Sequence, residues 1–307
     1  MSSDIEARDY ARGALFGVAA VTIWSGWMLA ARFGLRTSLT PWDITAIRFA
    51  VAGPVLLPYL LRKGLAIDHL GWAGLAAILV GIGAPTVLIG YAGLVFAPAA
   101  HGSALFTGTI PLMVAVLAAL LLGERFAIIK RIGLALLLVG VVGIVWNAGG
   151  TLGSRQNVGH VLFLTASLLF ALCTVVMRKA RLDGLHVAAL AAVGSLLMYV
   201  PAYAAATGLS VFNAPWRDIA LQALMQGLLT AVISLRLYGR AISILGASSG
   251  AAFTALAPAM TAVLGIPLLG EWPTAVDWIA ILLISAGVWF VSGGPLPERP
   301  GFLSKAA

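Results

Sequence analysis

The sequence predicts an all-α integral membrane protein in which ten transmembrane helices form two inverted five-helix repeats, with both termini in the cytoplasm. Three observations lead to this fold class. The 307 residues are 61% hydrophobic and only 10% charged, a balance typical of membrane proteins. The apolar residues fall into ten long runs, and part of the second half of the chain repeats the first half in register.

Each of the ten runs is long enough to cross the hydrocarbon core as a helix, which takes about 20 residues. The runs are continuously apolar rather than alternating, and this favours helices over a β-barrel. The first run is longer than a signal-peptide core, so we expect it to be an uncleaved span. The expected spans are 12–33, 43–61, 71–94, 98–122, 127–147, 158–178, 185–207, 217–240, 248–269 and 274–293.

The basic residues set the orientation of these spans. The net charge is +8, but the positive charges are scattered over short loops and form no single basic face, so nucleic acid is not an expected partner. With the N-terminus inside, the cytoplasmic flanks hold 14 Lys and Arg residues and the external flanks hold four. Cytoplasmic loops carry such an excess, so both termini are predicted to lie inside.

The fourth and ninth expected spans repeat one another. Shifting residues 101–143 by 147 positions onto 248–290 matches 16 of 43 residues without a gap. The matches include residues that a generic apolar helix does not need, such as the Gly-Glu pairs that end at Glu124 and Glu271. Such self-similarity indicates a duplicated module. We therefore divide the chain into two repeats, residues 1–147 and 148–307.

The duplication also tests the orientation. Each repeat has five spans, an odd number, so the second repeat must be inverted relative to the first. The positive charges that follow Glu124 are absent after Glu271, where the predicted loop is external. Two inverted repeats are typical of secondary transporters, which bind substrate near the membrane midplane between the repeats.

The residues that repeat also resemble a known family. The paired helices that contain Pro111 and Pro258 and end in Leu-Gly-Glu, together with Tyr91 and Tyr238 before them, resemble the drug/metabolite transporter superfamily and its ten-span EamA-type members. Trp24-Ser25-Gly26 in the first span and the Ala-Ile-Arg48-Phe sequence in the second add to the resemblance, which covers nearly the whole chain. Within the superfamily, the chain looks most like bacterial aromatic-amino-acid and amino-acid exporters.

This resemblance implies a multi-pass protein of the bacterial inner membrane that uses no cofactor and no metal. It also implies a central cavity lined by spans 1, 3, 4, 6, 8 and 9, with spans 5 and 10 at the periphery. We expect a monomer that binds a small-molecule substrate within the lipid bilayer, with a dimer as the alternative.

Aromatic and small polar residues near the middle of these spans are the candidates for binding substrate. A mostly apolar lining with a few amides and hydroxyls suits an amphiphilic metabolite of amino-acid size. The alternative for any single aromatic residue is core packing or lipid contact. A mid-membrane amide such as that of Gln226 needs a partner or water. The candidates are Trp24, Ser25, Trp27, Tyr91, Phe106, Thr107, Phe170, Thr174, Gln226, Ser234, Tyr238, Phe253 and Thr254.

Arg48 lies about one and a half turns into the second span, which enters from outside. One interpretation is that Arg48 binds a substrate carboxylate. The interpretation favoured by its place near the interface is structural, with the side chain reaching outward to pair with Asp43 or Asp277.

Prolines and glycines inside the spans are candidates for hinges. Proline leaves a backbone carbonyl free and can kink a helix, and Pro111 and Pro258 occupy equivalent places in the two repeats. Gly83 and Pro85 indicate close packing or bending in the third span. Static kinks that shape the cavity are the alternative to moving hinges.

The titratable residues argue against a proton-driven pump. Expected spans contain no Asp or Glu near their middle, where such pumps usually place a carboxylate. We interpret Glu124 and Glu271 as helix-end elements, and His69, His160 and His186 as solvated residues at span ends. His101 is interpreted as an interfacial side chain, with a proton-binding role as the alternative.

No catalytic residues are predicted, since the sequence has no Walker lysine loop, zinc-protease motif or nucleophile elbow. The expected function is export of amino acids, of broad or aromatic specificity, by alternating access around a midplane cavity, either facilitated or driven by a second gradient. Another small metabolite or drug, such as a nucleotide sugar or a purine, is the alternative substrate. A membrane-embedded enzyme or a lipid scramblase is the alternative from another class.

Overall fold

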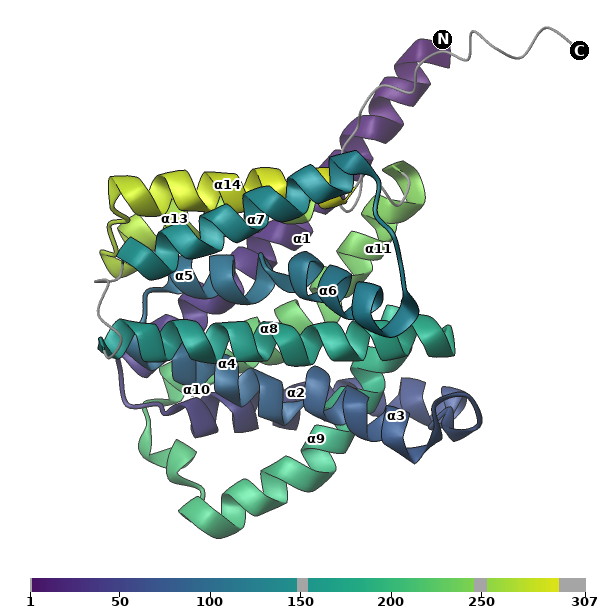
Figure 1. Cartoon of the computed structure of the whole chain (residues 1–307). Helices are drawn as coiled ribbons and strands as arrows, with labels where there is room; N and C mark the ends of the chain where they lie inside the picture. Colours follow the sequence, from purple (N-terminus) through teal and green to yellow (C-terminus); the bar gives the residue numbers. More distant parts are fainter. Residues whose placement is uncertain (1, 148–153, 246–252, 293–307) are drawn as a thin grey trace, which may run out of the picture.

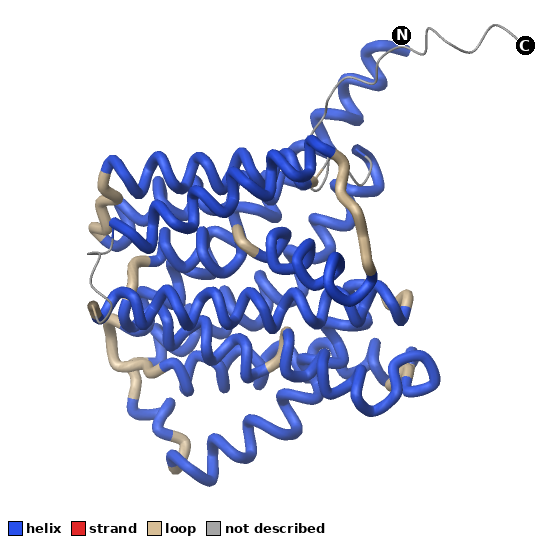
Figure 2. The backbone as a smooth tube through the Cα atoms, in the orientation of Figure 1, coloured by secondary structure: helices blue, strands red, loops and turns tan. Residues whose placement is uncertain are grey.

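The computed structural model describes residues 2–147, 154–245 and 253–292. These residues form helices of several kinds and no strand, and the helices run side by side so that their ends gather on two opposite sides of the bundle (Figures 1 and 2). The first residues of the ninth expected span (248–252), the last residue of the tenth (293) and the C-terminal residues after it fall outside the described residues.

Eight helical stretches are long and apolar enough to cross a membrane, and two further apolar helices are shorter. The two shorter stretches correspond to the ninth and tenth expected spans, so a topology of ten crossings stays a prediction. The eight are Tyr10–Leu35, Pro41–Lys63, Ile67–Phe96, Ala99–Leu121, Ile128–Asn147, Arg155–Ala180, Gly184–Thr207 and Trp216–Leu245, and the shorter two are Phe253–Leu269 and Ala275–Val291.

Five of the eight long stretches are single α-helices. Their starts are capped as the sequence allows: Thr40 and Asp43 form a capping box, and the side chains of Ser154 and Asp183 accept backbone N–H bonds from the first turns that follow them. The five helices are α1 (Ser2–Leu35), α2 (Pro41–Lys63), α7 (Ile128–Asn147), α8 (Arg155–Ala180) and α9 (Gly184–Thr207).

The third stretch is broken into α3 (Ile67–Gly81) and α4 (Ala84–Phe96), where the sequence predicts one helix. A Cβ atom on Gly83 would lie 2.1 Å from the carbonyl oxygen of Leu79, so the chain can turn here only with glycine. The Ser195 hydroxyl accepts the freed N–H of Ala84 at 2.9 Å, and Pro85 lies in the first turn of α4. The predicted bend is therefore a break between two helices.

The prolines of the repeated helices also mark breaks. Pro111 and Pro258 lie in the first turns of α6 (Ile110–Leu122) and α13 (Ala257–Leu269) rather than in the middle of continuous helices. The segment before α6 comprises α5 (Ala99–Gly102) and the π-helix η1 (Ser103–Thr107), whereas the 3₁₀-helix η4 (Phe253–Leu256) precedes α13. Proline provides no N–H to continue the preceding helix, which explains why both stretches change form at this point.

The eighth stretch contains a long π-helix. It begins as α10 (Trp216–Gln222), continues as the π-helix η3 (Ala223–Ile233) and ends as α11 (Ser234–Leu245). The short 3₁₀-helix η2 (Ser210–Asn213) connects it to α9, and α14 (Ala275–Val291) ends the described chain. π-Helical segments are rare and often lie at functional sites.

The packing pairs of the bundle correspond between its two halves. α7 packs on α14 and α2 packs on α9, which joins the fifth stretch to the tenth and the second to the seventh. α1 packs on α11, and α8 packs on α4. In both pairs the first stretch of one half packs on the third stretch of the other half. α7 and α14 lie together along the upper edge of Figure 1, and the glycines Gly133 and Gly287 let their backbones meet closely.

The faces that turn away from these contacts are apolar and exposed. Trp146, Val139 and Leu282 on α7 and α14 are each more than half exposed. A large apolar surface of this kind suits lipid rather than water.

Candidate functional site

Three buried side chains from distant parts of the sequence form a closed hydrogen-bonded ring at the centre of the bundle. The indole Nε1 of Trp27 on α1 donates to the hydroxyl of Tyr91 on α4 at 2.8 Å. That hydroxyl donates to Oε1 of Gln226 on η3 at 2.7 Å. The Nε2 of Gln226 then donates to the carbonyl oxygen of Trp27 at 3.2 Å. We call Trp27, Tyr91 and Gln226 the central ring.

A second amide supports the central ring. Nε2 of Gln226 also donates to Oε1 of Gln222 at 3.0 Å, and Nε2 of Gln222 donates to the carbonyl oxygen of Ala30 at 2.7 Å. Both amides are fully buried. Burying an amide without a polar partner costs free energy. Gln226 has such partners, so the expectation that it needs one is confirmed.

Arg48 lies against the central ring. Its Cζ atom is 5.4 Å from the centre of the Trp27 ring and 5.9 Å from that of Phe49, within the range of cation–π attraction. Its Nε and Nη1 atoms are buried and have no hydrogen-bond partner among the described residues. Buried guanidinium N–H groups normally find acceptors, so these two donors could bind a group from outside the described residues.

Neither carboxylate that the sequence suggested for Arg48 is available to it. Asp43 accepts hydrogen bonds from Thr40, Ser210 and the Tyr203 hydroxyl, and Asp277 contacts His101 and Asn147. The structural interpretation of Arg48 as an outward-reaching partner of these two residues is wrong, because both are already bound at the end of the bundle.

Aromatic residues extend the site on both sides of α1. Phe106 lies edge-on to Trp27, with ring centres 5.7 Å apart, and contacts Phe170 of α8 in the same way at 6.5 Å. On another side, Nε1 of Trp24 donates to the Ser234 hydroxyl at 2.9 Å, and the Trp24 ring lies 5.0 Å from that of Tyr238. The predicted residues therefore form two groups, one around Trp27 and one around Trp24.

The remaining candidates are placed elsewhere or are used locally. The Ser25 hydroxyl donates to the carbonyl oxygen of Ala257 at 3.3 Å and so joins α1 to α13. The hydroxyls of Thr107 and Thr174 donate to carbonyl oxygens one turn earlier in their own segments. Phe253 lies against Gly17 of α1, and Thr254 follows it in the 3₁₀-helix η4.

At one side of the bundle, Glu271 joins three elements. Its carboxylate accepts from Arg32 Nε at 2.9 Å, from Arg36 Nη2 at 2.7 Å and from the backbone N–H of Ala99 at 2.8 Å. The two arginines also donate to the carbonyl oxygens of Leu94 and Leu269. We call this side, where α1 ends and α5 begins, the Glu271 end. From the sequence we interpret Glu271 as a helix-end residue and do not predict this network.

The same end contains a buried pair of histidines. His101 Nδ1 lies 3.0 Å from His160 Nε2, and His101 Nε2 lies 3.2 Å from Asp277 Oδ1. The expectation that His101 and His160 are interfacial or solvated is wrong, since both are buried between α5, α8 and α14. His186 is buried too and contacts the carbonyl oxygen of Gly64, whereas His69 is exposed as expected. Sequence position gave each histidine's depth along a span but not the face of the helix it occupies.

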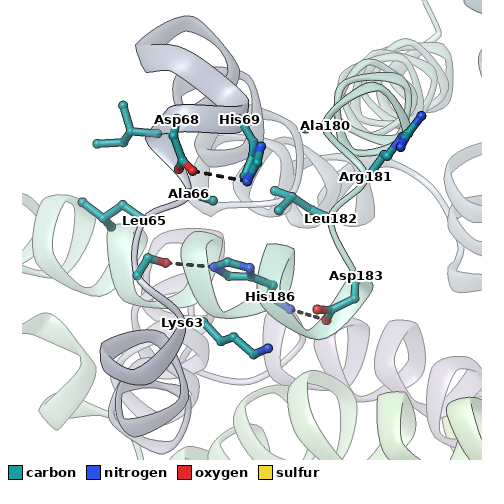
Figure 3. A pocket seen from close by; sticks show the side chains of 12 residues that line it. Lys63, Leu65, Ala66, Asp68, His69, Ala180, Arg181, Leu182, Asp183 and His186 are labelled. Atoms are coloured by element: carbon teal, nitrogen blue, oxygen red, sulfur yellow. Dashed lines mark hydrogen bonds and ion pairs between the residues drawn. The ribbon is translucent and has the colours of Figure 1, made fainter.

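The opposite side, which we call the Glu124 end, is more open. Glu124 contacts Arg178 at 3.4 Å, and Asp183 lies 3.5 Å from the Tyr59 hydroxyl. A pocket of about 830 Å³ lies here between the loop after α2 and the loop after α8 (Figure 3). Figure 3 shows Asp183 and His186 on one wall and Asp68 and His69 on another. The lining residues are Lys63, Gly64, Leu65, Ala66, Ile67, Asp68, His69, Ala180, Arg181, Leu182, Asp183 and His186.

The arrangement is that of a membrane transporter: long apolar helices, a polar cluster at their centre and ends that differ in closure. The profile of the EamA-like transporter family matches residues 11–146 and, a second time, residues 157–293. The chain belongs to this family.

Known proteins agree with this assignment. The chain is 27% identical over 305 residues to a protein of Escherichia coli strain K12 named "Uncharacterized inner membrane transporter YedA", covering 94% of this chain and 93% of that one. The protein of the same name from Escherichia coli O157:H7 gives the same values. A solved crystal structure aligns over 96% of this chain and 99% of its own with a TM-score of 0.59, and at 20% identity this likeness shows the fold alone. The chain is thus a multi-pass transporter of the inner membrane.

Proposed function

We propose that this protein moves amino acids across the inner membrane by alternating access, with Arg48 binding the substrate carboxylate. The observation that carries the proposal is the pair of buried guanidinium nitrogens, Nε and Nη1, that have no partner among the described residues. They lie beside the central ring, in the middle of an apolar bundle. A carboxylate fits such donors because it can accept two parallel N–H bonds from one guanidinium.

The groups around Arg48 suit the rest of an amino acid. Trp27, Phe106 and Phe170 offer aromatic surface for an apolar side chain. The amides of Gln222 and Gln226 offer carbonyl oxygens for an ammonium group, once one of their present bonds is exchanged. A nucleotide sugar is a weaker fit, because a diphosphate calls for several cations and the cluster as described provides Arg48.

The corresponding contacts at the two ends support alternating access. The pair of Glu271 and Arg32 at one end corresponds to the pair of Glu124 and Arg178 at the other. In each pair, the glutamate follows one of the two repeated helices, and the arginine lies near the end of the first helix of a half, α1 or α8. In the proposed cycle the contacts at the Glu271 end loosen as those at the Glu124 end tighten. The two arrangements are alternatives, and substrate selects between them through its contacts with Arg48 and the central ring.

The predicted orientation places the Glu271 end outside and the Glu124 end inside. The central ring holds no carboxylate that could carry a proton across, so the proposed transport is facilitated and runs down the gradient of the substrate. Export is the direction that the resemblance to amino-acid exporters implies. One chain supplies every residue of the site, which is consistent with a monomer.

The proposal is tested by exchange in liposomes. Purified protein is reconstituted, loaded with unlabelled phenylalanine, and assayed for uptake of labelled phenylalanine, threonine, methionine and lysine, with a nucleotide sugar as the competing class. We expect saturable exchange of several amino acids. Phenethylamine, which is phenylalanine without its carboxylate, should compete poorly with the wild-type protein.

Arg48→Gln should weaken phenylalanine binding by roughly 10- to 100-fold, because it removes a charge-assisted hydrogen-bond pair. It should leave the weak binding of phenethylamine nearly unchanged. Arg62→Gln, at an exposed position of the same helix, is the matched control and should bind as the wild type does. Equal losses for both ligands, or exchange of the nucleotide sugar alone, would show that the substrate assignment is wrong.

A further inference from the structure

We propose that His101, His160 and Asp277 form a proton-binding site whose occupancy holds the Glu271 end closed. The site is built from three elements, α5, α8 and α14, and lies apart from the central ring. Its distances are 3.0 Å between the imidazoles and 3.2 Å between His101 Nε2 and Asp277 Oδ1. The effect of this site on transport rests on the proposed function, whereas proton binding itself needs no substrate.

The hydrogen-bond pattern fits two neutral imidazoles. Neutral His101 donates from Nε2 to Asp277 and accepts at Nδ1, where Nε2 of His160 and Nε2 of Gln156, 3.2 Å away, both lie in reach. His160 then carries its proton on Nε2, so its Nδ1 is a bare acceptor. That Nδ1 atom is buried and has no partner among the described residues.

One added proton is accommodated with both imidazoles in place, once the Gln156 amide turns its oxygen toward His101. If His160 takes the proton on Nδ1 and passes its Nε2 proton to Nδ1 of His101, His101 becomes an imidazolium that donates to Asp277 and to His160. The proton comes from water at the Glu271 end, and the positive charge is offset by the carboxylate 3.2 Å away. In a buried site this attraction is screened far less than in water.

Asp277 is fixed in place for this role. Its Oδ1 accepts from Nδ2 of Asn147 at 3.0 Å, and its Oδ2 accepts from the backbone N–H and hydroxyl of Thr274 at 2.9 Å each. A carboxylate held by several donors stays ionised, so it remains a counter-charge for the histidines.

Proton binding is linked to closure because the same short helix makes both contacts. His101 lies two residues after Ala99, whose N–H donates to Glu271, and Asp277 lies six residues after Glu271. Movement of α5 away from α13 and α14 breaks the Glu271 contact and the His101–Asp277 contact together. An imidazolium loses its counter-charge in that open state, so the proton binds the closed state more tightly and stabilises it.

Other charges around the site do not replace this pair. The groups that face it from the packed elements are Arg32 and Arg36 at the end of α1, Glu271 after α13, Arg155 at the start of α8, His160 of α8 and Asp277 of α14. Arg32 and Arg36 both bind Glu271, and the Arg155 guanidinium lies 5.9 Å from the Phe96 ring. No charged group occupies the described parts of α4 and η1, which also contact α5.

Among the described residues, the Glu124 end shows no equivalent site. The residue that corresponds to Asp277 under the 147-residue shift is Lys130, whose ammonium group lies over the Phe126 ring at 4.3 Å. The proton effect is therefore expected from the pH at the Glu271 end and not from the pH at the Glu124 end.

The test follows the imidazoles by NMR in protein labelled at histidine, during titration from about pH 4 to about pH 9, the range that a histidine can cover. We expect the resonances of the two buried rings to change together, because one hydrogen bond joins them. In Asp277→Asn, where the counter-charge is lost, that change should move to lower pH or disappear. Asparagine can still accept the N–H of Thr274, so the start of α14 keeps its cap.

His69 and Asp68 provide a matched control within the chain. Their atoms His69 Nε2 and Asp68 Oδ2 are also 3.2 Å apart, but the side chains are 67% and 75% exposed, against 4% and 7% for His101 and Asp277. Asp68→Asn should leave the pH dependence of phenylalanine exchange unchanged, since water screens an exposed pair.

Flux gives the second measurement. In liposomes that exchange phenylalanine, acidifying the side that faces the Glu271 end should slow exchange by up to about tenfold for each pH unit below the midpoint. His101→Asn, which leaves the α14 cap intact, should abolish this dependence. A titration of His101 and His160 that Asp277→Asn does not move, or no titration at all, would overturn the proton site. If no amino acid exchanges at any pH, the proposed function fails while the NMR titration still decides the proton site.

Discussion

The two ends of the bundle carry corresponding residues but bind them to different degrees. At the Glu271 end, the carboxylate of Glu271 is only 10% exposed and accepts bonds from two arginines and a backbone N–H. At the Glu124 end, the carboxylate of Glu124 is 33% exposed and contacts one arginine at 3.4 Å. Glu271 and Glu124 occupy equivalent positions in the two repeats, yet the Glu271 end is closed and the Glu124 end is held by weaker contacts.

A second pair of contacts shows the same difference. The second stretch of each half begins with an aspartate and carries a tyrosine near its end, and each aspartate faces the tyrosine of the other half. Tyr203 donates to Asp43 and accepts the N–H of Val211 at 3.0 Å, in a buried network that includes Ser210. Tyr59 lies 3.5 Å from Asp183 at the exposed Glu124 end. Two independent contacts thus differ in the same direction, as expected if one conformation of a two-state protein is seen.

The largest effect is expected from Glu271→Gln. The substitution leaves Arg32 and Arg36 without a counter-charge in a part-buried place and should lower the free energy of unfolding by about 3 kcal/mol. The measurement is denaturant-induced unfolding in mixed micelles. Glu124→Gln is the matched control and should cost less than about 1 kcal/mol, because its pair is exposed. Equal costs at the two sites would remove the difference between the ends.

Tyr203→Phe should have the next largest effect. It removes one donor to Asp43 and the acceptor of the Val211 N–H, at an expected cost of about 1–3 kcal/mol in the same unfolding assay. Tyr59→Phe removes a long and exposed contact and should change stability by less than about 0.5 kcal/mol. A larger cost at Tyr59 than at Tyr203 would contradict the conclusion that the Glu271 end is the more tightly closed of the two.

The smallest effect is expected from salt. Raising the salt to about 1 M shortens the screening length to about 3 Å, so the small cost of Glu124→Gln should disappear. The cost of Glu271→Gln should change less, because the side chains of Glu271 and Arg32 are only 10% and 18% exposed. Unfolding of both variants and the wild type at low and high salt measures this. Equal salt sensitivity would indicate that the Glu271 contacts are as exposed as those of Glu124.

Much of the fold was predictable because composition and span length depend only on the order of residues along the chain. The ten predicted spans correspond to the eight long stretches and the two shorter apolar helices, although the third is broken at Gly83. The break depends on the contact between the Ser195 hydroxyl and the N–H of Ala84, which are 111 residues apart. Local sequence cannot show such a partner.

Prediction of the candidate site was less complete, for a related reason. Gln226 stood out because an amide is costly in an apolar span, and the structure provides its partners. His160 looked like a residue at a span end, and only the packing of α8 against α5 shows that it is buried. Spans that are apolar on all sides carry little information about which face turns inward. Which of the predicted residues touch substrate stays a prediction.

The π-helix η3 has a consequence for how variation in the gene would act. Ala223–Ile233 separates α10, which carries Gln222, from α11, which carries Ser234 and Tyr238. Consecutive residues of an α-helix differ in direction by about 100°. An in-frame loss of a single codon within this segment, other than that of Gln226, would turn α11 about the helix axis and carry Ser234 and Tyr238 away from Trp24, while leaving the side chains of the site encoded. The alignment of the two aromatic groups thus depends on the number of codons between Gln222 and Ser234 as much as on their identity.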